Sequence, residues 1–527
     1  MADYKILKSG TDIRGRAIAS DDAPAILTER AVADLASAFV LWLTRRTGKN
    51  RIKLAIARDS RLTGESFTRA IISALRLTGQ DICDCGLFST PAAYLVTQFP
   101  SVHADGSIMI TASHHPKDIN GLKFFTADGG VNSAELDEII ALAENGETVT
   151  IGPRSIAISR DCMRLYCDML TDIIRKGTGL WLPLKGMKIA VDAGHGAGGF
   201  FATRVLAPLG ADISPSQFLE PDGEFPAHAP NPENAEAMES LKNRVLETGA
   251  DLGVIFDADA DRSAVVASDG TEINRSKLIA LAASIVLPEH PGATIVTDSV
   301  TTEGLREFIE SRGGVQKRFR RGYRNVIDEA KRLNASGVDA PLAIESSGHA
   351  AFAEHYFLDD GAYFIARILV VLSALRREGS DLTELISELR LPKEEADIRL
   401  SLTGSNWRAT ATTVTERLTS LSERMLKLSN DNYEGVRAYV SHAKGYFIVR
   451  TSVHDPVLPI YIESDKEGGA VQIARFLKSF LYGFRGVDCA PLDDYIKKEE
   501  ARLGVESEEE SGDGFGTAEE PSYDQGF

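Results

Sequence analysis

The 527-residue sequence has few cysteines and no long apolar run. Its five cysteines, at positions 83, 85, 162, 167 and 489, form no CxxC pair and are odd in number, so neither a disulfide framework nor a zinc site is predicted. The most apolar stretch, residues 364–375, is too short to span a bilayer. The first residues, MADYKILKSGTDIRG, lack the apolar segment of a secretory signal. We expect a cytoplasmic protein, or one of an organelle stroma whose targeting peptide has been removed.

The sequence also lacks net positive charge. Its formal net charge is −18, and the segment after Arg502 contributes eight acidic residues and no basic one. Such a surface repels nucleic acid and anionic membranes, so neither is expected as a partner. A small anionic metabolite can still bind where arginine and lysine side chains converge.

Short runs rich in Val, Ile and Leu end at Gly, Asp, Ser or Thr and lead into helix-like stretches, which is typical of parallel strands covered by helices. Three segments, beginning at Lys53, Lys188 and Ala293, share a strand, polar turn and helix pattern. They predict three similar α/β domains in series. After residue 393, alternating runs such as GYFIVRTS and a helix over 409–428 predict a smaller α+β domain. We expect domains at 1–158, 159–272, 273–393 and 394–502, followed by an acidic, disordered tail at 503–527.

A metal site is predicted in the segment DLGVIFDADADRSAVV, where a buried strand leads to Asp257, Asp259 and Asp261. Three carboxylates so close repel one another unless a cation neutralises them, and oxygen-only ligands favour Mg²⁺ or Ca²⁺ over zinc. An EF-hand loop is excluded, because it needs Gly at its sixth position and Glu at its twelfth, where this chain has Arg262 and Ser268. A solvated acidic turn would not explain why so apolar a strand leads into it.

Three other loops follow predicted strands. The first contains Ser113, His114, His115 and Lys123 and lacks the G-x-S-x-G elbow of a hydrolase nucleophile, which leaves a functional loop or an ordinary polar turn. The second contains Glu345, Ser347 and His349, side chains suited to binding sugar hydroxyls. The third contains Arg450, Thr451, Ser452 and His454 before a proline, and is either a phosphate site or a surface turn.

Together with GTDIRG (10–15) and GLFSTP (86–91), these four loops in this order resemble the α-D-phosphohexomutase superfamily, which includes phosphoglucomutase, phosphomannomutase and phosphoglucosamine mutase. The resemblance extends to about residue 495. It implies three similar α/β domains and a smaller C-terminal α+β domain around a central cleft. It also implies interconversion of hexose 1-phosphate and hexose 6-phosphate, with glucose and also mannose phosphates as substrates, by a monomer or homodimer.

The resemblance assigns roles to individual residues. Ser113 would carry a phosphoryl group, and its phosphoserine would bind Mg²⁺ together with Asp257, Asp259 and Asp261. Phosphoryl transfer to the substrate would give a hexose 1,6-bisphosphate, which is both intermediate and activator. Further catalytic residues would be Arg14, Lys123 and Arg262, which offset charge, and His114 and His349, which are candidates for proton transfer. Substrate would be bound by Glu345, Ser347, Arg324, Arg450 and Ser452.

Three departures from the family pattern concern phosphate recognition. His115 replaces an Asn, Arg324 replaces a Lys, and Val453 and His454 replace an Asn-Thr pair. A cluster of basic residues between Lys317 and Arg324 could seat a phosphate or form a solvated turn. The alternatives are therefore a phosphoglucosamine mutase, a relative that forms hexose bisphosphate as its product, and a catalytically silent regulatory protein that binds sugar phosphates.

Overall fold

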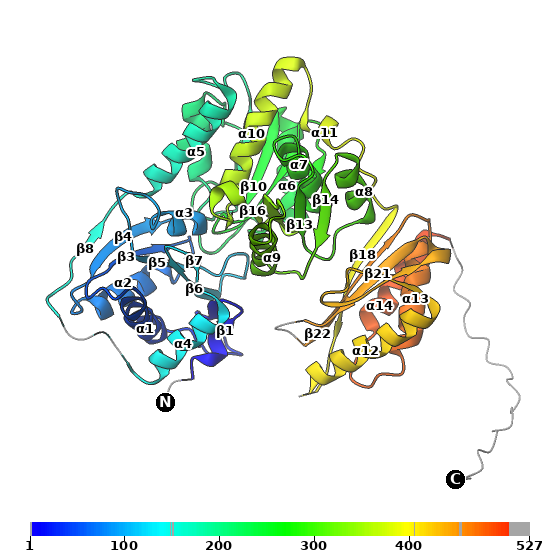
Figure 1. Ribbon diagram of the computed structural model, residues 1–527, viewed down its shortest axis with the longest axis horizontal. Helices are drawn as coiled ribbons and strands as arrows, with labels where there is room; N and C mark the ends of the chain where they lie inside the picture. The colour runs from blue at the N-terminus through cyan, green and yellow to red at the C-terminus, as the bar shows by residue number, and fades with distance from the viewer. Residues whose placement is uncertain (1–2, 148, 150–151, 405, 453–455, 505–527) are drawn as a thin grey trace, which may run out of the picture. The chain divides into compact units, whose positions relative to one another are not determined.

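The computed structural model describes residues 3–147, 149, 152–404, 406–452 and 456–504. The chain divides into two compact units, Met1–Leu391 and Pro392–Phe527. Within the described residues the strands form four sheets, whose elements are labelled in Figure 1. The predicted acidic tail lies outside the described residues from position 505 onward.

The first sheet is mixed, with parallel strands at its centre. Its strands, in spatial order, are β1 (Lys8–Ser9), β2 (Asp12–Arg16), β6 (Ile119–Thr126), β5 (Gly106–Ile110), β3 (Lys53–Arg58), β4 (Asp81–Leu87) and β8 (Ala157–Ser159), with β7 (Gly129–Gly130) paired to β6. Its helical segments are η1 (Lys5–Leu7), α1 (Glu29–Thr47), α2 (Gly64–Leu75), α3 (Thr90–Leu95) and α4 (Ser133–Glu144). All five residues of β5 are buried, as expected for a strand covered on both faces.

The second sheet contains the strand that leads to the predicted metal loop. Its order is β12 (Glu272–Ile273), β11 (Ser263–Ala267), β10 (Leu252–Phe256) and β9 (Ile189–Asp192). Its helical segments are α5 (Met163–Thr178), η2 (Phe201–Leu206), η3 (Ala207–Leu209) and α6 (Ala235–Thr248). Strand β10 is parallel to β9 and antiparallel to β11, so the aspartate loop is the turn between two neighbouring strands.

The third sheet again has a parallel core, in which β13 lies between β14 and β15. Its order is β14 (Val315–Arg318), β13 (Thr294–Thr297), β15 (Leu342–Ile344), β16 (Ala350–Phe352) and β17 (Leu358–Asp359). Its helical segments are α7 (Arg275–Val286), α8 (Glu303–Ser311), α9 (Tyr323–Ala335), η4 (Ala353–His355), α10 (Gly361–Glu378) and α11 (Leu382–Leu385).

One apolar core joins the first three sheets. It contains Met109 from the first sheet, Phe256 from the second and Ile295 from the third, all fully buried. Helix α10 packs against α5, and the two lie side by side in Figure 1. The first three sheets therefore form a single body in which loops from different sheets can contribute to one site.

The second unit contains the fourth sheet, which is antiparallel. Its order is β18 (Glu394–Ser401), β22 (Val457–Ser464), β21 (Gly445–Arg450), β20 (Gly435–Val440) and β19 (Lys427–Leu428). Its helical segments are α12 (Trp407–Met425), η5 (Ser441–Ala443), α13 (Gly469–Leu481) and α14 (Ala490–Arg502). Three α/β/α units in series and a further C-terminal domain of helices and an antiparallel sheet confirm the predicted fold class. The residue boundaries given for the domains stay predictions.

The helix expected after β9 is irregular. In place of an α-helix, the segment forms the π-helical turn η2 and the 3₁₀ turn η3. The backbone approaches closely just before this segment, where a Cβ at Gly199 would lie 2.3 Å from the carbonyl oxygen of Leu219. In addition, Pro208 has no amide hydrogen for an α-helical bond.

No helix among the described residues is long and apolar enough to cross a membrane.

Candidate active site

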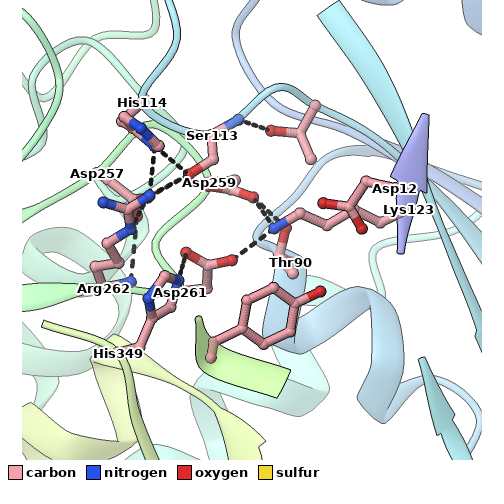
Figure 2. Close-up of polar contacts among 12 residues, drawn as sticks. Asp12, Thr90, Ser113, His114, Lys123, Asp257, Asp259, Asp261, Arg262 and His349 are labelled. Carbon is pink, nitrogen blue, oxygen red and sulfur yellow. Dashed lines mark hydrogen bonds and ion pairs between the residues drawn. The ribbon is translucent and has the colours of Figure 1, made fainter. Parts of the chain in front are cut away.

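The candidate site gathers where strands of the three sheets end. Ser113 follows β5, Asp257 follows β10, and Glu345 follows β15. Side chains at the carboxyl ends of parallel strands face the same edge of an α/β sheet, where ligands bind. Figure 2 shows Ser113, the three aspartates, Lys123, Arg262 and His349 turned toward one another.

Ser113 is held in a left-handed backbone conformation, with φ of 54°. Its amide donates to Thr111 Oγ1 at 2.9 Å, and its hydroxyl donates to Asp257 Oδ2 at 2.8 Å. The side chain is buried, with 1% exposed. A strained, buried and doubly hydrogen-bonded serine is typical of a functional loop, since such strain persists only where the surroundings fix it. This geometry argues against the ordinary polar turn.

The Ser113 loop is fixed from behind by Arg61, which is buried. Its guanidinium donates to the carbonyl oxygens of Ser113 and His115, and to those of Pro116 and Ile119 at 2.8 and 2.7 Å. It also pairs with Asp59 at 3.2 Å. Burial raises the pKa of Asp59 to about 6, even though Arg61 opposes that shift. Sequence reasoning missed both residues, although the polar turn DSR after β3 was visible.

The three aspartates offer carboxylate oxygens within 4.8 Å of one another, and all three are buried. Two buried carboxylate oxygens of these residues, Asp259 Oδ1 and Asp261 Oδ1, accept no hydrogen bond from any described residue. Asp261 Oδ1 has His349 Nε2 at 3.5 Å. Ala260, inside the loop, has a left-handed φ of 57°. Unsatisfied buried oxygens in an all-oxygen set fit a hard divalent cation such as Mg²⁺.

Charge repulsion among the aspartates is incompletely balanced by the protein. Burial, followed by the charges of Asp261 and Asp259, raises the pKa of Asp257 well above its usual range. Burial also disfavours ionised Asp261, but Lys123, His349 and Arg262 outweigh it and hold the pKa of Asp261 well below its usual range. A bound cation would stabilise the ionised form of all three carboxylates.

Lys123 is the buried cation nearest to the aspartates. Its ammonium donates to Asp259 Oδ2 at 3.0 Å and to Asp261 Oδ2 at 2.6 Å (Figure 2). Thr90, from the start of α3, donates its hydroxyl to the same oxygen of Asp259. Thr90 was not predicted as a site residue, although it lies within the GLFSTP segment.

Arg262 and His114 both contact the Ser113 hydroxyl oxygen. Arg262 donates to Ser113 Oγ at 3.3 Å and also contacts His114 Nδ1, while its Nε lies 3.4 Å from Asp257 Oδ2. His114 Nδ1 lies 3.3 Å from Ser113 Oγ. Burial, and then the positive charge of Arg262, lowers the pKa of His114 far below its usual range.

Glu345, Ser347 and His349 form one hydrogen-bonded group. Ser347 Oγ lies 3.0 Å from His349 Nδ1, and Glu345 Oε2 lies 3.4 Å from the same nitrogen. Although burial and Arg262 lower the pKa of His349, the nearby carboxylates of Asp359, Asp261 and Glu345 raise it to about 10. This turn requires a glycine at position 348, where φ is 94°. A Cβ added there would lie only 2.7 Å from the carbonyl oxygen of Ser263.

Arg14 and Arg324 lie at the edges of this group. Arg14 pairs with Asp12 at 3.0 Å and points one amino group at the carbonyl oxygen of Ala112, next to Ser113. Arg324 pairs with Asp328 at 3.0 Å. Arg324 also lines a cavity together with Lys123, Tyr323 and Lys331. Tyr323, missed by sequence reasoning, lies 3.0 Å from the Thr11 hydroxyl.

The predicted basic cluster of residues 317–324 does not form one solvated turn. Arg318 is buried and pairs with Glu303 at 2.9 Å, and Arg321 pairs with Glu233 at 3.0 Å. Arg318 is therefore part of the interior of the third sheet.

Two predicted substrate residues belong to the second unit. Arg450 ends β21, and Ser452 follows it on the next loop. Val453 and His454, the predicted departures in this loop, lie outside the described residues.

Comparison with known proteins gives matches along most of the chain. Residues 5–150, 165–270 and 274–391 match the alpha/beta/alpha domains I, II and III of phosphoglucomutase/phosphomannomutase. A phosphomannomutase/phosphoglucomutase of Pseudomonas syringae pv. tomato is 32% identical over 435 residues, covering 81% of this chain and 87% of that protein. A phosphoglucomutase of Neisseria gonorrhoeae is 30% identical over 437 residues, covering 82% and 89%.

A solved structure has the same fold. A phosphoglucomutase/phosphomannomutase family protein from Burkholderia thailandensis superposes with a TM-score of 0.74 at 25% identity, covering 92% of this chain and 99% of that one. The three domain matches, the level of identity and the shared fold agree with the loops that meet at Ser113. The chain therefore belongs to the phosphoglucomutase/phosphomannomutase family, isomerases that interconvert hexose 1-phosphates and hexose 6-phosphates.

Proposed function

We propose that this chain interconverts hexose 1-phosphate and hexose 6-phosphate through a phosphoserine at Ser113, with glucose phosphates and also mannose phosphates as substrates. The single observation that carries the proposal is the position of the Ser113 hydroxyl, 2.8 Å from a carboxylate of the aspartate cluster. A buried serine beside a cation-binding cluster suits storage and transfer of a phosphoryl group.

In the proposed reaction, phosphoserine gives its phosphoryl group to a free hydroxyl of the hexose phosphate. The bond between phosphorus and Ser113 Oγ breaks and a bond between phosphorus and the sugar oxygen forms. The sugar hydroxyl gives its proton to a base, and Ser113 Oγ takes up a proton to become a free hydroxyl. The product is a hexose 1,6-bisphosphate. Its other phosphoryl group then returns to Ser113 by the reverse steps, which leaves the isomeric monophosphate and explains why added bisphosphate would activate the enzyme.

Mg²⁺ would be held by Asp257, Asp259, Asp261 and an oxygen of phosphorylated Ser113. When bound, it would neutralise negative charge on the phosphoryl group. The protein adds two cations of its own near the phosphoryl group. Arg262 contacts Ser113 Oγ, and Lys123 contacts the aspartates. Phosphoryl transfer depends mainly on positioning and charge neutralisation, so these side chains are the proposed catalytic cations, with Arg14 beside Ala112.

Proton transfer is assigned to His114 or His349. His114 lies beside Ser113, whereas His349 lies beside the proposed sugar-binding pair, Glu345 and Ser347. A base must reach the reacting hydroxyl, so we expect the larger defect in the variant that lacks the histidine acting as base. Loss of the base should slow transfer from phosphoserine to sugar without preventing sugar phosphate binding. His114→Gln and His349→Gln can be compared by rapid mixing of phosphorylated enzyme with substrate.

In the second unit, Arg450 and Ser452 would bind the phosphate that is not being transferred. In the first unit, Arg324 is a separate candidate for binding substrate phosphate. Bidentate arginine contacts suit a phosphate group, and an arginine in the lysine position keeps its charge at every relevant pH.

The proposal is tested by intact-mass measurement and by turnover. We expect a mass increase of about 80 Da at Ser113 for one phosphoryl group, its loss on incubation with glucose 1-phosphate, and Mg²⁺-dependent turnover of glucose and mannose 1-phosphates. Ser113→Ala should show neither phosphorylation nor turnover, whereas the exposed Ser101→Ala should behave as the parent does. Phosphorylation and turnover that persist in Ser113→Ala would exclude the relay.

Side-by-side assays separate the alternatives. Preferred turnover of glucosamine 1-phosphate would identify a phosphoglucosamine mutase, and accumulation of bisphosphate would identify a bisphosphate-forming relative. Binding of sugar phosphate without phosphorylation or turnover would identify a silent regulatory protein.

A further inference from the structure

Three of the free cysteines converge although the sequence contains no CxxC pair. Cys83 and Cys85 are alternate residues of β4, and Cys162 is the residue that precedes α5. The Sγ atom of Cys83 lies 4.0 Å from that of Cys85 and 3.9 Å from that of Cys162. All three sulfur atoms lie within 4.8 Å of one another.

The two separations measured from the Cys83 sulfur correspond to those of a metal–thiolate site. Zinc–sulfur bonds are about 2.3 Å, which places thiolates of a tetrahedral or trigonal site roughly 3.8 to 4.0 Å apart. A disulfide needs sulfur atoms about 2.05 Å apart, so oxidation would require the thiols to move almost 2 Å closer. The observed geometry is therefore closer to that of metal ligands than to that of a preformed disulfide pair.

A helix terminus and two cations lie around the cluster. All three cysteines are buried, and Cys162 lies at the N-terminus of a 16-residue helix, where the helix dipole stabilises negative charge. Burial opposes ionisation of all three thiols, whereas the positive charges of Arg160 and Lys53 favour the thiolate of Cys83. Both cations are fixed in place, because Arg160 donates to the carbonyl oxygen of Ser101 and Lys53 donates to that of Val102.

We propose that Cys83, Cys85 and Cys162 bind a soft, thiophilic cation of the Zn²⁺ or Cu⁺ class. The site is separate from the aspartate cluster and differs in chemistry, because thiolate sulfur selects soft cations whereas carboxylate oxygen selects Mg²⁺. On binding, each thiol exchanges its S–H bond for a sulfur–metal bond and releases its proton to solvent. The ion would link β4 of the first sheet to the start of α5, a helix beside the second sheet.

The test uses the full chain, fully reduced and stripped of metal, with Cd²⁺ as a spectroscopic probe and Zn²⁺ as competitor. We expect an ultraviolet sulfur-to-cadmium band that saturates at one ion per chain, and Zn²⁺ should remove it. The aspartates can also bind Cd²⁺, but oxygen ligands give no such band. Zn²⁺ should raise the melting temperature, since an ion that binds only the folded state stabilises it.

A matched pair of variants separates the cluster from other cysteines. Cys162→Ala should lose the cadmium band, whereas Cys167→Ala should keep it, although Cys167 is also buried and lies on the same helix. Circular dichroism of the metal-free proteins checks that both variants are folded.

If the reduced and folded parent chain shows no cadmium band, the proposal is overturned, whatever the variants do. Mild oxidation could instead remove two hydrogens and give a cross-linked peptide pair that contains Cys83 and Cys162. That result, without a cadmium band, would assign the cluster to a disulfide and overturn the proposal.

Discussion

Ser113 donates its hydroxyl hydrogen to Asp257 Oδ2 at 2.8 Å, across 144 residues of sequence. The bond joins the loop after β5 to the loop after β10. Phosphorylation of Ser113 would remove this donor and place a phosphate oxygen against the carboxylate.

We therefore predict that phosphorylated protein, in the presence of a chelator, melts at a lower temperature than unphosphorylated protein. Mg²⁺ should reverse the difference, because a cation between phosphate and carboxylates converts repulsion into attraction. Differential scanning fluorimetry of the two forms, separated by ion exchange, measures both effects. Equal melting temperatures in chelator would contradict the prediction, and Ser113→Ala, which cannot be phosphorylated at this position, serves as the reference.

Asp259→Asn should weaken Mg²⁺ binding and lower turnover by about 100-fold or more. The same change should alter the stability of the metal-free protein little, because removing one of three repelling carboxylates offsets the weaker bond to Lys123. Titration calorimetry with Mg²⁺ and thermal melting check the two parts. The control is Asp269→Asn, on the exposed turn after β11. Normal Mg²⁺ affinity in Asp259→Asn would remove this residue from the proposed metal site.

Arg61→Lys tests whether the Ser113 loop depends on its support. Lysine keeps the charge but has no planar fork, so several buried carbonyl oxygens would lose their donors. We expect the free energy of unfolding to fall by about 1–3 kcal/mol. Transfer of the phosphoryl group from Ser113 to substrate should slow, while Mg²⁺ affinity stays unchanged.

The control for this variant is Arg69→Lys, on the surface of α2, where the side chain is 71% exposed. An unchanged transfer rate in folded Arg61→Lys would limit Arg61 to a structural role.

His228 predicts a pH-dependent stability. Its Nε2 lies 3.0 Å from Asp192 Oδ2 and its Nδ1 lies 2.9 Å from the carbonyl oxygen of Ala229, so both nitrogens face acceptors. Although burial lowers the pKa of His228, Asp192 outweighs that effect and raises the pKa above its ordinary value. The stabilisation is therefore fully present below about pH 6.5 and is lost as pH rises through the folded-state pKa.

Denaturant unfolding of the parent chain and of His228→Gln at several pH values measures this effect. The difference in free energy of unfolding should be largest in acid and should shrink toward alkaline pH. A difference that does not change with pH would contradict a protonated His228.

The sequence was informative wherever chemistry is local to one loop. The aspartate loop was predicted because three carboxylates at alternate positions repel one another, a property readable without a structure. Arg61 was not predicted, since its role depends on carbonyl oxygens more than 50 residues away. The cysteine cluster was missed for the same reason: Cys83 and Cys162 are 79 residues apart, and the pairing of β8 with β4 brings their sulfur atoms together.

The fold could be predicted further than the site. Apolar runs indicated strands in each of the four sheets, among them β3, β10, β13 and β21, which are largely buried. The irregular turn after β9 was not predicted, and the close approach of Gly199 to Leu219 beside it is a contact that local sequence does not show.

The apolar core shared by the first three sheets has a consequence for folding cooperativity. Met109 precedes the serine loop and Phe256 precedes the metal loop, yet both residues are packed in that one core. Denaturant should therefore disrupt the two loops in a single transition, without an intermediate that keeps one of them intact.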